Sequence, residues 1–223
     1  MTESATSARQ LPRGRHGLPR ELVIASQRER ILIATAQAMA ENGYVGTSVA
    51  AILKRAGVSR ETFYEQFRSK EHCFDAAYER AVQMLLDRIA DATGGEEDSA
   101  APGEQDAMAR MDRIFRAYLQ HLIDDPASAR LFLVEVFAVG SAAISRRAQL
   151  QELFVGLIAG VLDARTEQQR FACQALAAAI GSMVTARIAA GDPDGLLALR
   201  EPLLNLVRGG GELYGCAVVD HAP

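Results

Sequence analysis

The sequence predicts an all-α protein of about nine helices, on three observations. Apolar residues recur three and four positions apart over most of the 223 residues, which is the spacing of helices with one buried face. Alanine is abundant, Trp is absent and Pro occurs only 7 times, a composition that favours helices over strands. No segment shows a strand signal. A chain of this length buries roughly 70% of its unfolded surface, which is enough to fold without disulfides or metals.

Four helices with local capping or stop residues are predicted for the first part of the chain. The periodic pattern predicts helices over 21–43, 49–56, 60–67 and 70–92. Serine or threonine before a helix satisfies its free N–H groups, and glycine after it takes the left-handed conformation that ends it. The residues in these positions are Asn42-Gly43, Thr47 or Ser48, Gly57, Ser59 and Ser69.

The rest of the chain predicts five further helices. The stretch 93–106 has acidic but no basic residues and predicts a loop. Asp125-Pro126 combines a cap with proline at the first helical position. Pro202 either kinks the last helix or marks its true start. The five helices are expected over 106–124, 126–140, 141–164, 168–190 and 193–207.

The net charge of −4 hides an asymmetry along the chain. Residues 1–70 carry 11 Lys and Arg against 6 Asp and Glu, whereas residues 71–223 carry 13 against 22. A basic first third on an acidic remainder predicts a polyanionic partner for that part alone.

The cysteines and the apolar runs predict a cytoplasmic protein. The three cysteines are scattered and form no C-x-x-C pair, so no disulfide framework is expected. The N-terminus lacks the apolar core of a signal peptide. The longest apolar run, 154–162, is too short to span a bilayer.

Patterns of catalytic or metal-binding residues are missing from the sequence. There is no nucleophile elbow, phosphate loop, glycine-rich dinucleotide motif or pair of His ligands, and only 4 His in total. His121 lies near Asp124 and Asp125, but a single His beside a helix cap is usually solvated. We therefore expect no enzyme, no cofactor and no metal site.

Residues 49–67 have the pattern of a helix-turn-helix. Two short helices joined by a turn that contains glycine cross steeply, and Gly57 is free to take the left-handed conformation. The core of this unit is expected from Val49, Ile52, Leu53, Val58 and Phe63. This packing leaves Arg60, Glu61, Thr62 and Tyr64 on or near the outward face.

Residues 28–74 resemble the DNA-binding domain of the TetR family of transcriptional regulators. The pattern is a Gly-aromatic pair, a Thr, a short apolar helix, AGVS, an aromatic-Tyr pair, a Phe and a Lys-Glu pair. Gln66 departs from it, because the family often has His there. The helices after this segment agree with the family only in number and length. The matching residues are Gly43, Tyr44, Thr47, Ala56, Gly57, Val58, Ser59, Thr62, Phe63, Tyr64, Phe67, Lys70 and Glu71.

The resemblance implies how the helix-turn-helix would contact DNA. Helix 60–67 would enter the major groove, where side chains distinguish base pairs. Arg60 is the expected guanine reader, with Glu61 and Thr62 as secondary readers. The alternative is that such charged residues are solvated surface groups. Phosphate contacts are expected from Tyr64, Lys70, Thr47 and Ser48.

A basic arm with helix-breaking residues precedes these helices. Residues 1–20 carry Arg13 and Arg15 among prolines and glycines. Flexible arms of this kind insert arginine into a narrow minor groove. The alternative is a solvated tail, and the sequence leaves both interpretations open.

For the larger half of the chain, the resemblance implies dimerisation and an effector pocket. Helix 168–190 has a face of small residues, which either permits close approach of a partner helix or packs within one chain. Dimer contacts are expected from Ala175, Ala179, Ser182, Ala186, Leu203 and Leu206. The pocket wall, which could equally be plain core, is expected from Leu85, Phe115, Tyr118, Phe132, Phe137 and Phe154.

Together these expectations describe a ligand-responsive transcriptional regulator. It would be a homodimeric repressor that binds a palindromic DNA operator and is released by a small, largely apolar effector. The alternative is a constitutive DNA-binding protein or an activator without a ligand. The expected division is an arm at 1–20, a helix-turn-helix domain at 21–70, an effector and dimerisation domain at 71–215, and a tail at 216–223.

Overall fold

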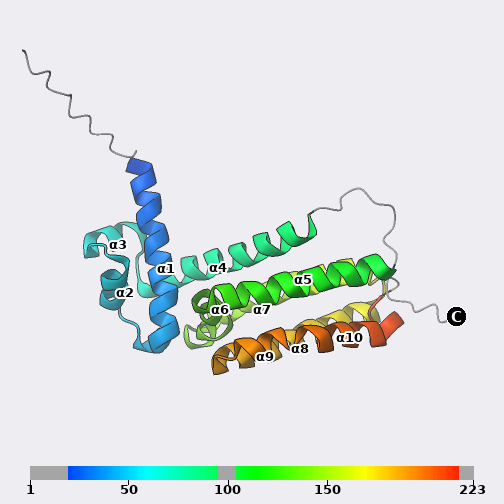
Figure 1. The fold of residues 1–223 in the computed structure, drawn as a ribbon. Coiled ribbons are helices and arrows are strands. Elements are labelled where there is room, and N and C mark those ends of the chain that lie inside the picture. The colour runs from blue at the N-terminus through cyan, green and yellow to red at the C-terminus, as the bar shows by residue number, and fades with distance from the viewer. Residues whose placement is uncertain (1–19, 95–103, 216–223) are drawn as a thin grey trace, which may run out of the picture.

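The computed structural model describes residues 20–94 and 104–215, and in these ranges the chain is helical without any strand (Figure 1). The prediction of an all-α fold is confirmed. Ten α-helices and two short 3-10 helices follow one another in the described ranges. They are α1 (Arg20–Gly46), α2 (Val49–Ala56), α3 (Arg60–Gln66), α4 (Lys70–Thr93), α5 (Glu104–Asp124), α6 (Pro126–Leu133), η1 (Glu135–Ala138), α7 (Ser141–Val161), α8 (Glu167–Ala190), α9 (Pro193–Leu197), α10 (Arg200–Gly210) and η2 (Gly211–Leu213).

Three helices, α1 to α3, form a unit at one end of the molecule that we call the head (Figure 1). Gly43 has a φ of 70° and interrupts α1 near its end, so that the chain turns toward α2. A side chain at this φ would be strained, which explains the glycine. Ile31, Met39 and Ile52 are fully buried and hold α1 and α2 together.

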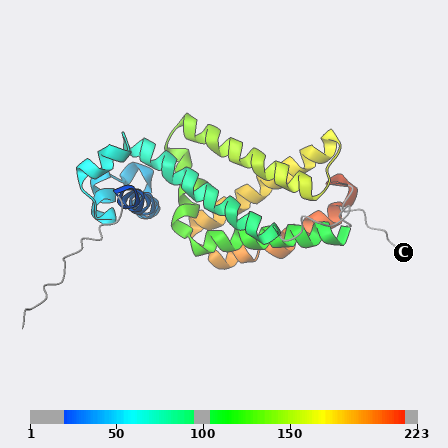
Figure 2. The ribbon, with the colours of Figure 1, turned by 90° about the horizontal axis from the view of Figure 1, so that it is seen from above.

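The remaining helices, α4 to α10, form an elongated bundle that we call the body (Figures 1 and 2). α4 starts at the head, packs against α1 and then runs along α5. α7 packs against α8, and α10 packs against α5. α6 contacts α1, α4 and α8, which places it at the junction of head and body.

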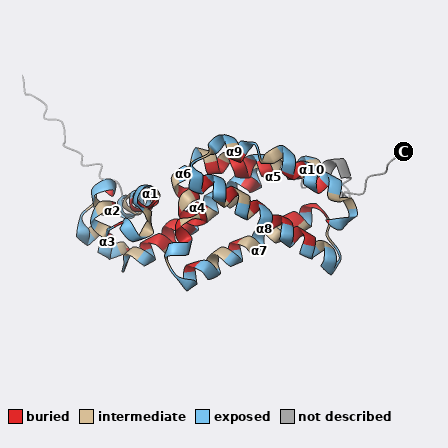
Figure 3. Cartoon of the chain, turned by 90° about the horizontal axis from the view of Figure 1, so that it is seen from below, coloured by how far each residue is buried: buried red, intermediate tan, exposed pale blue. Residues whose placement is uncertain are grey.

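Buried apolar side chains form one continuous cluster from the head into the body (Figure 3). Phe67 at the end of α3 and Phe74 in α4 are each almost fully buried. Farther along α4, Tyr78 and Leu85 continue the same buried face. The head is therefore packed onto the body through α4 and is not joined to it by a linker alone.

Two helices differ from the sequence-based expectation. The segment predicted as one helix over 126–140 divides into α6 and η1 at Val134, and directly after this break Glu135 turns its carboxylate toward the end of α1. The last predicted helix divides into α9 and α10. Pro202 is the third residue of α10, where its missing N–H needs no partner within the helix. It marks a helix start and not a kink.

α8 is the one helix of the described residues that is long and apolar enough to cross a membrane. Length and composition alone are weak evidence for such a span, because the core helix of a water-soluble protein passes the same test. Leu176, Ile180 and Val184 of α8 are buried in the body, and its small residues cover another face. The buried side of α8 therefore accounts for part of its apolar composition.

Candidate nucleic-acid interface and ligand cavity

The turn between α2 and α3 is held by short-range hydrogen bonds. Ser48 accepts a hydrogen bond from the Ala51 N–H at 3.2 Å, which makes it the cap of α2. Gly57 takes the left-handed conformation at φ 63° and ψ 42° and donates its N–H to the carbonyl of Leu53. Ser59 accepts the N–H of Thr62 at 3.0 Å and caps α3. The local sequence therefore sets the angle between the two helices.

One longer contact also closes this turn. The Arg30 guanidinium on α1 donates to the carbonyl oxygens of Ala56 at 3.1 Å and Gly57 at 2.9 Å. A cation at a helix C-terminus neutralises its free carbonyls and favours the dipole. The sequence analysis missed Arg30, because its partners lie 26 and 27 residues away.

α3 divides into a buried and an exposed side. Phe63 has an exposed fraction of 0% and lies in the head core. Arg60, Glu61 and Tyr64 are exposed on the other side, and the Arg60 guanidinium lies 5.6 Å from the centre of the Tyr64 ring. Thr62 is half-buried, and its hydroxyl lies 2.9 Å from the Ser59 hydroxyl. Arg60, Glu61 and Tyr64 thus have free access to a partner, whereas Thr62 is engaged in the cap.

Lys70 and Thr47 make hydrogen bonds within the head, and their expected role as phosphate contacts stays a prediction. The Lys70 ammonium donates to the carbonyl oxygens of Tyr44 at 2.8 Å and Thr47 at 2.9 Å, and it lies 4.2 Å from the centre of the Tyr44 ring. The Thr47 side chain is buried and donates to the carbonyls of Gly43 and Ala38 at 2.7 and 3.1 Å. Both therefore fix the link between α1 and α2.

Other cations flank α3 that the sequence analysis did not single out. Lys54 at the end of α2 and Arg68 between α3 and α4 are exposed. The feature of the sequence that could have indicated these two residues is their position near either end of α3. Arg55 is also exposed but forms an ion pair with Glu41. Arg13 and Arg15 of the expected arm lie outside the described residues.

The body contains an apolar cavity between α5, α6, α7 and α8, with a volume of about 50 Å³. The structure brings four of the six expected pocket residues to its wall, but Leu85 and Phe137 are not part of it. Leu85 is fully buried in the core elsewhere on α4, and Phe137 on η1 is 54% exposed. The four that line the cavity are Phe115, Tyr118, Phe132 and Phe154.

One residue that lines the cavity is a cation, and the sequence analysis did not predict it. The half-buried Arg147 of α7 lines the cavity beside Gln151. Burial raises the pKa of the Tyr118 hydroxyl to about 12, and the charge of Arg147 acts in the opposite direction. The tyrosine hydroxyl is therefore neutral at pH 7 and can donate a hydrogen bond.

A buried carboxylate joins the body to the head. Glu135 of η1 accepts the backbone N–H of Tyr44 at 2.7 Å, next to the break in α1 at Gly43. Its other carboxylate oxygen lies 3.2 Å from Nε of Arg130 on α6 as an ion pair. Glu135 is only 6% exposed, so both contacts are shielded from water.

The expected dimer residues fall into two groups. The α8 residues Ala175, Ala179, Ser182 and Ala186 are exposed, so this face does not pack within the chain. Leu203 of α10 is buried against its own chain, whereas Leu206 is 49% exposed.

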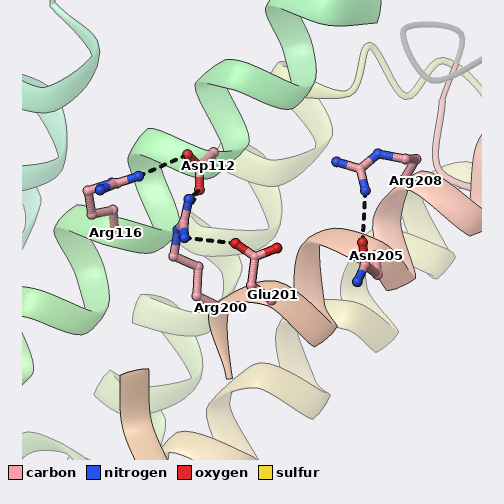
Figure 4. A network of polar contacts seen from close by, with 6 residues as sticks. All are labelled: Asp112, Arg116, Arg200, Glu201, Asn205 and Arg208. Carbon is pink, nitrogen blue, oxygen red and sulfur yellow. Dashed lines mark hydrogen bonds and ion pairs between the residues drawn. The ribbon is translucent and has the colours of Figure 1, made fainter. Parts of the chain in front are cut away.

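Polar contacts hold α10 onto α5, which explains the burial of Leu203 (Figure 4). Arg200 donates from Nε to Asp112 of α5 at 2.6 Å, and Asp112 also pairs with Arg116 at 3.4 Å. The buried Leu203 is thus engaged within its own chain. The expected pairing of α8 with α10 at a dimer interface stays a prediction.

The described residues offer no other reactive centre. No three His, Cys, Asp or Glu side chains lie together as metal ligands in these ranges. His121 is buried, which lowers its pKa, and it is not solvated as expected. Burial also raises the pKa of the Cys73 thiol to about 11, so this cysteine is a poor nucleophile at pH 7.

Comparison with known families decides the class of the protein. Residues 31–77 match the model of the bacterial regulatory proteins of the tetR family. Residues 31–77 are therefore a DNA-binding segment of the TetR type. This confirms the resemblance seen in the sequence, and the matching family is one of bacterial regulatory proteins.

One curated relative is similar to part of this chain. It is the uncharacterized HTH-type transcriptional regulator YvdT of Bacillus subtilis, which is 36% identical over 70 residues. The match covers 31% of the chain and 36% of that relative, so the chain matches only about a third of the relative's length.

Solved structures share the fold of head and body together. FadR from Bacillus subtilis, solved in complex with stearoyl-CoA, has a TM-score of 0.67 at 18% identity, over 80% of this chain and 96% of that one. The fatty acid degradation regulator FadR from Bacillus halodurans has 0.66 at 20% identity, over 81% and 93%. A TetR-like regulator from Rhodococcus sp. RHA1 has 0.61 at 22%, over 86% and 98%. At these identities the likeness concerns the fold.

Proposed function

We propose that the protein is a ligand-responsive repressor that binds a palindromic operator as a homodimer. The observation that carries this proposal is the division of α3, with Phe63 locked in the core and Arg60 and Tyr64 exposed on a capped, rigid helix. A helix presented in this way fits the major groove, where arginine reads guanine through two hydrogen bonds. Tyr64 and Ser48, together with Lys54 and Arg68, lie where they can contact phosphates.

The proposed effector is small and largely apolar. The cavity between α5 and α8 is lined mainly by aromatic and aliphatic side chains. Its volume of about 50 Å³ is well below the roughly 300–1,000 Å³ of typical ligand sites. The effector must therefore widen it, and the Tyr118 and Phe154 rings, 5.6 Å apart, are the contact that would separate. The complex of the structurally similar FadR with stearoyl-CoA supports an acyl chain as the apolar part.

The proposed dimer uses the exposed small-residue face of α8. The groove between this face and α7 is lined by Gly156, Gly160 and Phe171, and Phe171 is 69% exposed. Glycines permit close helix approach, and an exposed phenylalanine loses its contact with water when a partner covers it. Two copies packed through α7 and α8 would form a four-helix interface.

The effector would act on the head through α6 and η1. Phe132 and Leu133 of α6 line the cavity, and two residues later Glu135 holds Tyr44 of the head. A ligand that displaces α6 therefore also displaces the attachment of the head. By linkage, DNA must weaken effector binding by the same factor that the effector weakens DNA binding.

Selection of bound DNA from a random pool, followed by Arg60→Ala, tests the proposal. The wild-type protein should enrich a palindrome, and Arg60→Ala should reduce discrimination between that operator and one mutated at a single base pair by about 1–3 kcal/mol. The matched control Arg68→Ala should weaken both DNAs about equally. Equal discrimination by Arg60→Ala and wild type would remove Arg60 as a reader. The absence of any enriched sequence would contradict the regulator as a whole.

The rival function is constitutive DNA binding, or activation, without a ligand. The small volume of the cavity favours it, since a body with little empty space needs no effector. Binding of an apolar molecule to the body that changes operator affinity would exclude this rival. Under either function, we propose that the chain divides into the arm, head, body and tail expected from the sequence. We also propose that the protein is located in the cytoplasm.

A further inference from the structure

Arg147 has no acidic partner among the described residues, although it is half-buried. Its guanidinium lies over the face of the Phe137 ring, with 5.7 Å between the guanidinium carbon and the ring centre. The adjacent Arg146, by contrast, forms an ion pair with Asp75 at 2.6 Å. A guanidinium withdrawn from water without a carboxylate is costly, and such groups usually mark a binding site.

The guanidinium of Arg147 lies at the wall of the apolar cavity. A Cβ atom added to Gly181 on α8 would lie 3.6 Å from Nη2 of Arg147, so the charged group reaches across to that helix. Phe132, Phe154 and Ile180 line the same cavity. The cavity therefore has an apolar body and one fixed positive charge, and in its lining no acidic side chain balances that charge.

A second polar group near Arg147 also lacks a partner. The Tyr78 side chain on α4 is 5% exposed, and its hydroxyl makes no hydrogen bond within the described part of the chain. Burial raises the pKa of Tyr78, while the charges of Arg147 and Arg146 lower it, so the hydroxyl lies within the field of both arginines. It lines a groove with Arg146 and Glu79, and this groove shares Leu150 with the cavity that Arg147 lines. An unpaired buried hydroxyl is a donor available to a ligand.

We infer that the cavity binds an aliphatic carboxylic acid, with its carboxylate held by Arg147 and the Tyr78 hydroxyl and its chain among the cavity phenylalanines. This inference rests on the proposed function and specifies its effector. Two N–H groups of a guanidinium match the two oxygens of a carboxylate in a bidentate pair. The ligand would remove two unfavourable features of the empty protein, an unpaired cation and an unpaired hydroxyl.

The charge of the site selects a free acid over a neutral derivative. An alcohol or thioester of the same chain has no charge at this position, so Arg147 would stay unpaired beneath it. The coenzyme of an acyl-CoA carries phosphates that are distant from the acyl carbonyl. A carboxylate directly on the chain is therefore the head group that fits a cation in the cavity wall.

The test measures binding of sodium decanoate and 1-decanol to the full-length protein by calorimetry. Wild type should bind decanoate about 10- to 100-fold more tightly than decanol, the factor expected for a charge-assisted hydrogen bond. Arg147→Met keeps the apolar stem and should reduce this ratio to about one. The control Arg116→Met replaces an exposed arginine on α5 and should leave the ratio unchanged. Equal affinities of wild type for the two molecules, or no decanoate binding, would overturn the inference.

Tyr78→Phe gives a second test that does not depend on the charge. Since the hydroxyl is unpaired in the empty protein, its removal should leave the melting temperature equal or higher, while decanoate affinity falls about 3- to 10-fold. An unchanged affinity for decanoate would contradict the role of Tyr78. Decyl phosphate and decanoyl-CoA serve as further probes, and tighter binding of either than of decanoate would overturn the choice of a carboxylate.

DNA binding separates this inference from the proposed function. A protein that enriches an operator but shows no preference for decanoate disproves the inference and remains a regulator. A protein that prefers decanoate but enriches no DNA sequence disproves the regulator and retains the carboxylate site. Lowered operator affinity in decanoate, but not in decanol, supports both.

Discussion

The head and the body both contain local helix caps, but their longer polar contacts span different distances along the chain. In the head, Ser48 and Ser59 each cap a helix by bonding an N–H three residues later, and Arg30 reaches a carbonyl 27 residues away. In the body, Glu135 bonds a residue 91 positions away, and Arg200 bonds one 88 positions away. Local contacts make the head a unit whose shape follows from a short segment, whereas the body depends on which helices meet.

This difference has a functional consequence. A head whose turn is set by caps keeps α3 rigid, which base readout requires. A body that encloses a small cavity can rearrange when a ligand enters. Under the proposed function, recognition and response would therefore lie in different regions of the molecule.

The largest expected effect tests the two sides of α3. Phe63→Ala should destabilise the protein by about 3–5 kcal/mol, because a fully buried aromatic ring leaves a cavity in the head core. The adjacent Tyr64→Ala should cost only about 1 kcal/mol, through its edge contact with Phe63 at 5.3 Å. Urea unfolding of both variants measures the difference. Similar losses of stability would contradict the assignment of an inner and an outer side.

A smaller effect is expected where the head depends on a long-range contact. Lys70→Met removes two charge-assisted hydrogen bonds, to Tyr44 and Thr47, and should cost about 2–3 kcal/mol. Arg68→Met at an exposed site should change stability by less than about 0.5 kcal/mol. Thermal unfolding of the two variants shows whether Lys70 stabilises the head. If Lys70→Met kept full stability and lost only affinity for all DNAs, Lys70 would be a phosphate contact after all.

The smallest effect on stability, and the most specific one, is expected at the junction. Glu135→Ala removes the acceptor of the Tyr44 N–H and should cost about 1–2 kcal/mol. The ratio of operator affinities with and without effector, normally about 5- to 150-fold, should fall toward one. Fluorescence anisotropy of labelled operator measures that ratio. A ratio equal to wild type would show that the signal takes another route from body to head.

Much of the fold was predictable from the sequence, and the features that were not predicted depend on contacts between distant residues. The bounds of α2 and α4 lie within about one residue of the expected ones, since serine caps and glycine stops act locally. The split between α6 and η1 was not predictable, because it depends on a contact between Glu135 and the end of α1. Pro202 left two interpretations open, and the start of α10 decides between them.

The candidate sites show the same limit. Phe115, Phe132 and Phe154 were expected at a cavity on the basis of their apolar size, and they do line one. Phe137 has the same character but lies at the surface. Size and polarity in the sequence predict burial, but they do not predict which buried residues enclose a space.

By itself, the sequence determined the all-α class, the helix-turn-helix and the two sides of α3, because the helical period and the caps act over three or four residues. Only the tertiary structure decided that Lys70 ties the head together, that Glu135 attaches it to the body and that Arg147 stands unpaired at the cavity. Long polar side chains reach several partners, and the choice among them depends on helices that meet only after the chain has folded.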